Sequence, residues 1–428
     1  MKIKLFFVHP KNYGNMMMAA SFITYFTNIL ENKYRDLPEF YVDVLDDYEL
    51  ELVRKSLPAG IKVYRENLFN RKRRGVFGKL QKAVFIPYEI YYNIKNYDAC
   101  VLLGGDCISQ YYSRQVFISN MLKLHFIAKR NIVLAPGQTM GPFHGYAIRL
   151  VKWAMKDCFI YARDHDCYLY IKNNFDFENL FEARDLAALD IPYQNNRQIV
   201  QDTLNKYIGN REYITIVPSG ANFQYTPDTE HYVEEYVKII ENTLEHTRFD
   251  VLLLAHVIHT NTSNDKVIVD QIADKISGRF KGRLTIIDSL ILPYEARILL
   301  GNGQYTITGR MHAAVSSINM GVPAICLSYS VKYKGVIGDV YGMNDYILQC
   351  RGADAWQGDR VYTTIVEMQK ELYKNKDRIQ KALVEKNVNV KKLSLWQIED
   401  IVDRIAQYVS DKNNEKAVRE LMKNEKFR

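Results

Sequence analysis

The sequence predicts an α/β protein built from two doubly wound, Rossmann-like domains that face a cleft. Apolar segments that end in small or polar residues alternate with helical stretches, which is typical of a parallel sheet covered on both faces. The alternation pauses near residue 190, in the polar stretch IPYQNNRQ, and then resumes, and 428 residues suit two ordinary domains. We therefore predict an N-terminal domain over 1–195, a C-terminal domain over 205–385, and a C-terminal helix with a charged tail over 386–428.

The first domain begins with an apolar strand at 4–8, and a helix follows from residue 16 to about residue 32. Asn15 suits the N-cap of this helix, because its side chain can accept hydrogen bonds from free backbone N–H groups, and Gly14 permits the turn before it. The other predicted strands of this domain lie in 99–105, 131–137 and 159–164, each with a helical stretch after it.

The second domain repeats the pattern. Its predicted strands lie in 213–220, 250–257, 284–288, 305–309 and 323–329, with helices at about 228–246 and 265–276 among them.

The C-terminal helix is predicted to begin at Ser394, which forms a capping box with Gln397. We expect its apolar face to pack against the body of the protein and to reach back to the first domain. That face consists of Leu395, Ile398, Ile401, Val402, Ile405 and Val409.

Composition excludes several classes of protein. Hydrophobic residues make up 47% and charged residues 25%, as in soluble globular proteins, and no run approaches the roughly 18 apolar residues of a membrane span. The six cysteines include no C-x-x-C pair, so we expect reduced thiols and a cytoplasmic location. The net charge of +8 favours small anionic ligands over nucleic acid. His256 and His259 have no third ligand nearby, so we predict no metal site.

Unusual residues gather where the predicted strands end, which is where open parallel sheets bind ligands. The sequence TGRMHAAVSS places Arg310 and His312 at a helix N-terminus, where an anion is favoured, and the histidine can exchange a proton near neutral pH. Lys332 follows the next strand and should reach the same ligand. Arg163 forms either an ion pair with Asp164 or a second anion clamp from the opposite domain. Further candidates for the cleft are Asn15, Asp106, Gln138, Ser219 and His256.

Two other signals are weaker. The GGD sequence at 104–106 suits a phosphate turn or close helix–sheet packing, but the chain has neither G-x-G-x-x-G nor a P-loop motif for a nucleotide. The basic and aromatic segment 71–97 suits an ordinary amphipathic helix, or peripheral contact with the inner, anionic face of a membrane.

The sequence resembles the polysaccharide pyruvyl transferase family from about residue 8 to residue 347. The resemblance is carried by HPKNYGN, LLGGD, APGQTMGPF, ARDHDCYLYI, ITGRMHAAVSSINMGVPAICLSYSVKYKG and GMNDYIL. It implies a glycosyltransferase-B (GT-B) fold with the site between the domains. It also implies transfer of pyruvate from phosphoenolpyruvate to two hydroxyls of a sugar as a cyclic ketal, in the synthesis of bacterial capsule or exopolysaccharide.

By the same resemblance, Arg163, Arg310, His312 and Lys332 bind the donor and carry out proton transfer. We expect His312 to be the general acid and the cations to stabilise the departing phosphate, with no cofactor and no metal. Asp106 departs from the glycine of many relatives and bears on the acceptor, which is a sugar or a lipid-linked oligosaccharide. Because like charges from two domains would repel each other, we expect an open cleft that phosphoenolpyruvate closes.

Two alternatives remain at this point. One is a GT-B glycosyltransferase that uses a nucleotide sugar, which would explain the cleft and the cations but lacks a nucleotide motif. The other is a non-catalytic protein that binds glycan precursors, against which the full set of Arg163, Arg310, His312 and Lys332 argues.

Overall fold

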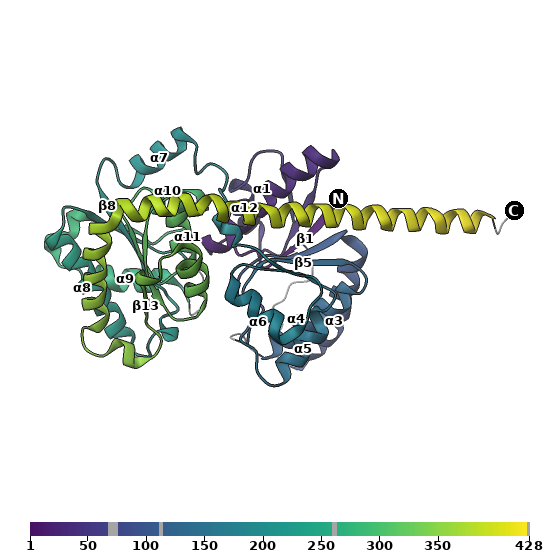
Figure 1. Ribbon diagram of the computed structural model, residues 1–428, viewed down its shortest axis with the longest axis horizontal. Helices are drawn as coiled ribbons and strands as arrows, with labels where there is room; N and C mark the ends of the chain where they lie inside the picture. The colour runs from purple at the N-terminus through teal and green to yellow at the C-terminus, as the bar shows by residue number, and fades with distance from the viewer. Residues whose placement is uncertain (67–75, 111–113, 259–262, 426–428) are drawn as a thin grey trace.

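The computed structural model describes residues 1–66, 76–110, 114–258 and 263–425, with the side chains of 76–84 and 416–425 outside that description. Two parallel β-sheets lie side by side, and one long helix runs across both (Figure 1). The first sheet has seven strands in the order β3-β2-β1-β4-β5-β6-β7, and the second has six in the order β10-β9-β8-β11-β12-β13. Helices cover both sheets, which confirms the predicted pair of doubly wound units.

The first sheet changes direction between β1 and β4, so the loops after these two strands meet at its carboxyl edge. Those loops contain HPKNYGN and GGD. The strands are β1 (Lys2–Phe6), β2 (Glu39–Val42), β3 (Lys62–Arg65), β4 (Ala99–Leu102), β5 (Ile132–Gln138), β6 (Phe159–Ala162) and β7 (Leu180–Glu182), and the helices are α1 (Tyr13–Tyr34), α2 (Asp47–Lys55), α3 (Val76–Asn96), α4 (Arg114–Ala128), α5 (Tyr146–Met155) and α6 (His165–Phe175).

The second sheet changes direction between β8 and β11, which brings the loop after β8 beside the GRMH sequence. Its strands are β8 (Tyr213–Val217), β9 (Asp250–Leu254), β10 (Leu284–Ile287), β11 (Thr306–Thr308), β12 (Ala324–Ser328) and β13 (Ile347–Gln349), and its helices are α7 (Arg197–Tyr207), α8 (Thr229–His246), α9 (Asp265–Lys275), α10 (Pro293–Gly301) and α11 (Met311–Asn319).

The start of α1 corrects one prediction. Asn12, not Asn15, is the N-cap: its extended backbone lets its Oδ1 accept hydrogen bonds from the backbone N–H groups of Gly14 (3.1 Å) and Asn15 (3.4 Å). Asn15 lies inside the first helical turn. The helix therefore starts three residues earlier than the prediction of residue 16.

The long helix α12 (Arg360–Glu425, 66 residues) corrects another, because it does not begin at Ser394. Ser394 is buried within the helix, and its Oγ donates to the backbone oxygen of Asp185 (3.0 Å). Gln397 donates to the backbone oxygen of Arg184 (2.7 Å) and accepts from the backbone N–H of Gly137 (3.0 Å). The predicted capping box is thus an anchor that ties α12 to the first domain.

The apolar face of α12 packs as predicted. Its central side chains Ile398, Ile401, Val402 and Ile405 are fully buried in the main hydrophobic core, which extends through both domains. A separate core lies beneath α4 and α5, on the other side of the first sheet. The last part of α12 extends past the body of the protein (Figure 1).

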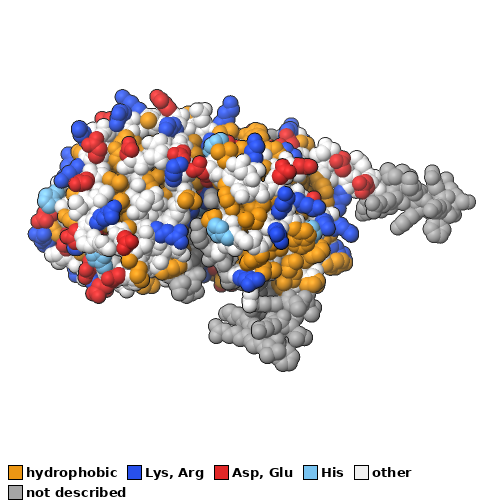
Figure 2. Space-filling model, turned by 60° about the horizontal axis from the view of Figure 1, so that its bottom comes forward, with side chains coloured by type: hydrophobic (Ala, Val, Ile, Leu, Met, Phe, Trp, Pro, Cys, Tyr) orange, Lys and Arg blue, Asp and Glu red, His pale blue; other side chains and the backbone are white. Residues whose placement is uncertain are grey.

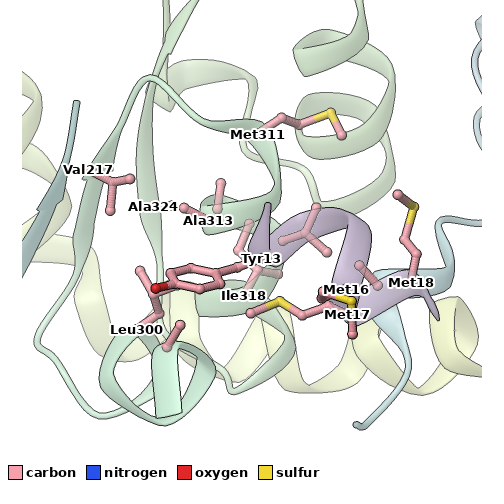
Figure 3. Close-up of a cluster of buried hydrophobic side chains, with 14 of the residues drawn as sticks. Tyr13, Met16, Met17, Met18, Val217, Leu300, Met311, Ala313, Ile318 and Ala324 are labelled. Carbon is pink, nitrogen blue, oxygen red and sulfur yellow. The ribbon is translucent and has the colours of Figure 1, made fainter. Parts of the chain in front are cut away.

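Helix α1 of the first domain packs directly on α10 and α11 of the second. Tyr13 lies beside Ala313 and Ile318 in this shared apolar interface (Figure 3). Its hydroxyl accepts a hydrogen bond from the backbone N–H of Ile291 (2.9 Å), and its own N–H donates to the backbone oxygen of His256 (3.2 Å). The two domains therefore share a core at their contact.

The six cysteines are free, and all except Cys107 are buried. Within the described parts of the chain, no helix combines the length and the apolar character that crossing a membrane demands.

Candidate active site

A cavity of about 840 Å³ lies where the carboxyl edges of the two sheets meet. Its wall comes from both domains: the loops after β1, β4 and β6 contribute from the first, and the loops after β9, β11 and β12 from the second. The structure thus brings most of the predicted site residues together. Those that line the cavity are Asn15, Asp106, Arg163, His256, Arg310, His312 and Lys332.

Gln138 and Ser219 are not in this wall. Both are buried and serve the backbone: Gln138 donates to the carbonyl oxygens of Leu102 (2.8 Å) and Pro136 (3.2 Å), and Ser219 accepts from the N–H of Ala221 (3.2 Å). His259, which forms a possible metal-binding pair with His256 in the sequence, lies outside the described residues.

Arg163 and His312 meet on one carboxylate, that of Asp185. The Arg163 guanidinium donates to Asp185 Oδ2 (2.8 Å) from within the first domain, and His312 Nε2 of the second domain lies 3.3 Å from the same oxygen. Arg163 is only 1% exposed, and its Nε also donates to Thr139 Oγ1 (2.6 Å). A rigid Arg–Asp–His chain therefore crosses the domain interface.

The structure does not pair Arg163 with Asp164. Asp164 instead caps α6, where its Oδ1 accepts a hydrogen bond from the backbone N–H of Cys167 (2.8 Å). The local ion pair considered from the sequence is therefore wrong, and Arg163 lines the cavity.

Asp185 is ionised despite its burial. Removal from water disfavours its charged form, but the charges of His312 and Arg163, together with a hydrogen bond from the Ala187 N–H (2.8 Å), outweigh that effect and hold its pKa well below the usual range. The same pairing keeps the pKa of Arg163 raised, because the Asp185 charge more than offsets burial of the guanidinium. His312 therefore faces a carboxylate that fixes the orientation of its ring.

Sequence reasoning missed Asp185, although a signal was present. The residues ARD occur twice, at 162–164 and at 183–185, and the second copy follows β7 as the first follows β6. Because β7 is only three residues long, it gives no strand pattern, and the second copy was not placed at a strand end.

Arg310 is the N-cap residue of α11, as predicted for the start of that helix. Its guanidinium donates to both oxygens of Asp265 (2.5 to 3.2 Å) and to the backbone oxygen of Ser263 (2.9 Å). Asp265 also accepts from the backbone N–H groups of Gly220 (2.6 Å) and Val257 (2.8 Å). Burial lowers the pKa of Arg310, but the charge of Asp265 raises it by more, so the pKa is raised overall and Arg310 stays a cation.

Lys332 forms a second ion pair across the interface. Its Nζ lies 3.1 Å from Asp106 Oδ2 of the first domain and donates to the Tyr329 hydroxyl (2.9 Å). Arg163, Arg310 and Lys332 each have a carboxylate partner in the structure. These ion pairs offset part of the mutual repulsion of the cations, and the open cleft that phosphoenolpyruvate closes stays a prediction.

Gly14 gives His312 its place. A Cβ atom added at Gly14 would lie 2.3 Å from His312 Nδ1, far inside van der Waals contact. The first turn of α1 can therefore approach the imidazole only because residue 14 has no side chain. The sequence predicted that Gly14 permits a turn; in the structure, Gly14 leaves the space that the His312 ring occupies.

His256 is a neutral histidine at the bottom of the cavity. It is 1% exposed, and its Nε2 has no hydrogen-bond partner among the described residues. Burial, and then the nearby charges of His312 and Arg310, lower its pKa well below the usual value. His256 is for this reason a poor proton donor at neutral pH.

This environment predicts a pH dependence of stability. Below about pH 6.5 the unfolded chain binds a proton at His256, whereas the folded protein does not. As the pH is lowered through this range, the free energy of unfolding should therefore decrease by up to about 1.4 kcal/mol per pH unit. Denaturant unfolding between pH 7.5 and 5 should show a shallower slope for His256→Gln than for wild type. His144→Gln, at an exposed site, should keep the wild-type slope. Equal slopes for wild type and His256→Gln would contradict this assignment.

A protein-family model matches most of the chain. Residues 12–331 match the model described as polysaccharide pyruvyl transferase. One curated relative is the amylovoran biosynthesis protein AmsJ of Erwinia amylovora, 23% identical over 260 residues, which is 57% of this chain and 60% of the relative. The chain thus matches somewhat less than two thirds of that protein's length.

Solved structures with similar folds include two sugar-nucleotide proteins. The UDP-GlcNAc 2-epimerase of Neisseria meningitidis, solved with UDP-GlcNAc, has a TM-score of 0.60 at 11% identity, over 94% of this chain and 100% of the other. The MnaA structure with UDP from S. aureus has a TM-score of 0.59 at 11% identity, over 96% and 97%. At these identities the likeness shows the fold alone, which is the two-domain GT-B arrangement.

Proposed function

The chain belongs to the polysaccharide pyruvyl transferase family, and from this premise we propose that it transfers pyruvate from phosphoenolpyruvate to two hydroxyls of a sugar as a cyclic ketal. The product would be part of a bacterial capsule or exopolysaccharide. The observation that carries the proposal is the convergence of Arg163, Lys332 and Arg310 around His312 in one interdomain cavity.

The cations suit the donor. Phosphoenolpyruvate has a phosphate and a carboxylate, and each needs donors held in a fixed place. Arg163 and Lys332 reach the cavity from opposite domains while bound to Asp185 and Asp106, and these ion pairs keep their positions before the donor arrives. Such preorganised charge is most useful for the phosphate as it departs.

The proposed reaction balances with the residues at hand. His312 donates a proton to the methylene carbon of the enol, and the first sugar hydroxyl adds to the neighbouring carbon and releases its own proton, which restores the acid. The second hydroxyl then displaces phosphate, which takes the second proton. Asp185, ionised and 3.3 Å from the ring, holds His312 in position for the first step. The balance involves no redox change, and the proposal needs no metal or other cofactor.

The acceptor, a sugar or a lipid-linked oligosaccharide, is proposed to approach along Asn15 and Asp106. Asp106 lies at the cavity wall beside Lys332, so its carboxylate can take the proton of the second hydroxyl and pass it to the departing phosphate. Asn15 offers an amide to a second hydroxyl; its own Nδ2 now donates to the backbone oxygen of Phe7 (3.3 Å).

Ligand-induced thermal stabilisation tests the donor. Phosphoenolpyruvate at saturating concentration should raise the melting temperature of wild type and should do so less for Lys332→Ala, whereas UDP-GlcNAc should have little effect on either. Release of inorganic phosphate with candidate glycans then tests transfer. Stabilisation by UDP-GlcNAc and not by phosphoenolpyruvate would favour a nucleotide-sugar glycosyltransferase; stabilisation by phosphoenolpyruvate without phosphate release from any glycan would favour a binding protein.

A further inference from the structure

The outer face of the first domain, formed by α3, α4 and α5, has an unusual composition. These helices lie side by side on one side of the first sheet, away from α12 (Figure 1). Large hydrophobic side chains that globular proteins normally cover are exposed on all three. They are Tyr88 (42% exposed), Tyr91 (59%), Val116 (52%), Phe126 (45%), Tyr146 (42%) and Trp153 (38%).

The charges of α3, α4 and α5 are nearly all positive, although Asp157, Asp176 and Glu178 border the hollow that Arg149, Lys152 and Lys156 line. From Cys107 to Lys156 the sequence has seven Lys and Arg residues and no Asp or Glu, and the described part of α3 adds Lys95 and only the buried Glu89. None of the exposed side chains of Lys95, Arg149 and Lys152 forms an ion pair with a described residue. Carboxylates return only after α5, at Asp157.

The aromatic and basic side chains are interleaved. The exposed positions of α5 follow a helical repeat along one side, with Tyr146, Arg149, Lys152 and Trp153 in succession, and Lys156 follows as the C-cap residue. The Arg114 guanidinium lies 4.7 Å from the Tyr146 ring centre, and Lys95 lies 5.6 Å from that of Tyr91. Figure 2 shows hydrophobic and basic side chains gathered together on this side of the first domain.

We propose that the α3–α4–α5 face binds the surface of an anionic phospholipid bilayer. Tyrosine and tryptophan are the side chains that favour the boundary between water and lipid, because each has an apolar ring and a polar tip. Lysines and arginines around them are attracted to lipid phosphates, at about 1 kcal/mol for each residue near the surface. Charge complementarity thus favours an anionic occupant, because an uncharged apolar partner would leave exposed cations such as Lys95, Arg149 and Lys152 without counter-charges.

The α3–α4–α5 face lies next to the interdomain cavity, so a membrane contact there could bring a membrane-bound substrate close to the active site. Val116 and Lys123 of α4 and Glu89 of α3 line one end of the cavity. A bilayer bound to the helices would therefore lie beside that end, where a membrane-bound substrate could enter. The binding itself does not depend on the proposed pyruvyl transfer and can be tested without it.

Vesicle sedimentation with the full chain tests the proposal. Wild type should bind vesicles of phosphatidylcholine mixed with phosphatidylglycerol, should bind pure phosphatidylcholine poorly, and should release as salt rises. Arg149→Glu/Lys152→Glu should weaken binding by about 10-fold or more. The matched control Lys281→Glu/Lys370→Glu makes the same change in net charge at exposed positions of the second domain and of α12, and should keep wild-type binding.

A fluorescence measurement places the contact. In a Trp396→Phe variant, Trp153 is the exposed tryptophan, since Trp356 is buried at 3% exposure, and brominated lipid should quench it. No binding to anionic vesicles at low salt would overturn the proposal. Equal losses in the two double variants would do the same and indicate attraction by net charge alone, and binding without quenching of Trp153 would move the contact elsewhere on the protein.

Discussion

His312→Gln should lower turnover by about 100-fold or more while phosphoenolpyruvate still stabilises the protein to nearly the wild-type extent. Glutamine fills a similar volume and can still donate to Asp185, but it has no proton to give at neutral pH. The surroundings of His312 favour this outcome, because Gly14 and Asp185 of the first domain hold the ring of this second-domain residue at the cavity wall. Phosphate release and thermal stabilisation, measured on the same preparation, separate chemistry from binding.

The control for this experiment is His165→Gln. His165 lies at the start of α6 with its side chain 61% exposed, and it pairs with Glu182 outside the cavity lining. Its loss should leave turnover unchanged. If His312→Gln kept near wild-type turnover, the proton would have to come from another group, and the neutral, buried His256 is poorly suited to supply it.

Arg163→Ala should have the largest effect on stability, because it leaves the buried Asp185 carboxylate without its main partner. Loss of one member of a buried ion pair typically costs about 3 to 5 kcal/mol, and donor binding should fall with it. Arg163→Lys should restore both only in part, since an ammonium group cannot reach Asp185 and Thr139 together as the guanidinium does. Urea unfolding and phosphoenolpyruvate titration measure the two effects.

The double variant Arg163→Met/Asp185→Leu separates structure from binding. With both charges gone, most of the lost free energy of unfolding should return, but phosphoenolpyruvate should still bind weakly. If the double variant bound the donor as tightly as wild type, Arg163 would be a structural residue only, and donor binding would belong to Arg310 and Lys332.

The fold was largely predictable from the sequence, because its central strands are unbroken apolar runs with polar residues at their ends. Strands such as β4 and β5 are buried along their whole length, and each leaves a plain signal. The strands β2, β3, β7 and β13 have three or four residues each, and several of these are charged or half exposed, so no periodic pattern marks them. Tertiary contacts decide their conformation.

The site was predictable as a set of cations but not as a network. Strand ends indicated Arg163, Arg310 and Lys332, and also Asp106, but the ion pairs could not be read from the sequence. Asp185 and Asp265 meet their arginines through tertiary contacts within one domain, and Asp106 meets Lys332 across the interface. Ser394 and Gln397 show that a local sequence pattern can also be misleading when tertiary contacts are not known. Their spacing is that of a helix start, but tertiary hydrogen bonds to the first domain claim both side chains within a continuous helix.

The long helix α12 also dictates an order of events during synthesis. The side chains that complete the core of the N-terminal half, Ile398 to Ile405, are made more than 200 residues after its last strand, β7. At ribosomal speeds of about 5 to 20 residues per second, that apolar surface stays uncovered for on the order of ten to forty seconds. We therefore expect the core beneath α12 to be completed only after the final helix emerges, whereas the separate core beneath α4 and α5 contains first-domain residues alone.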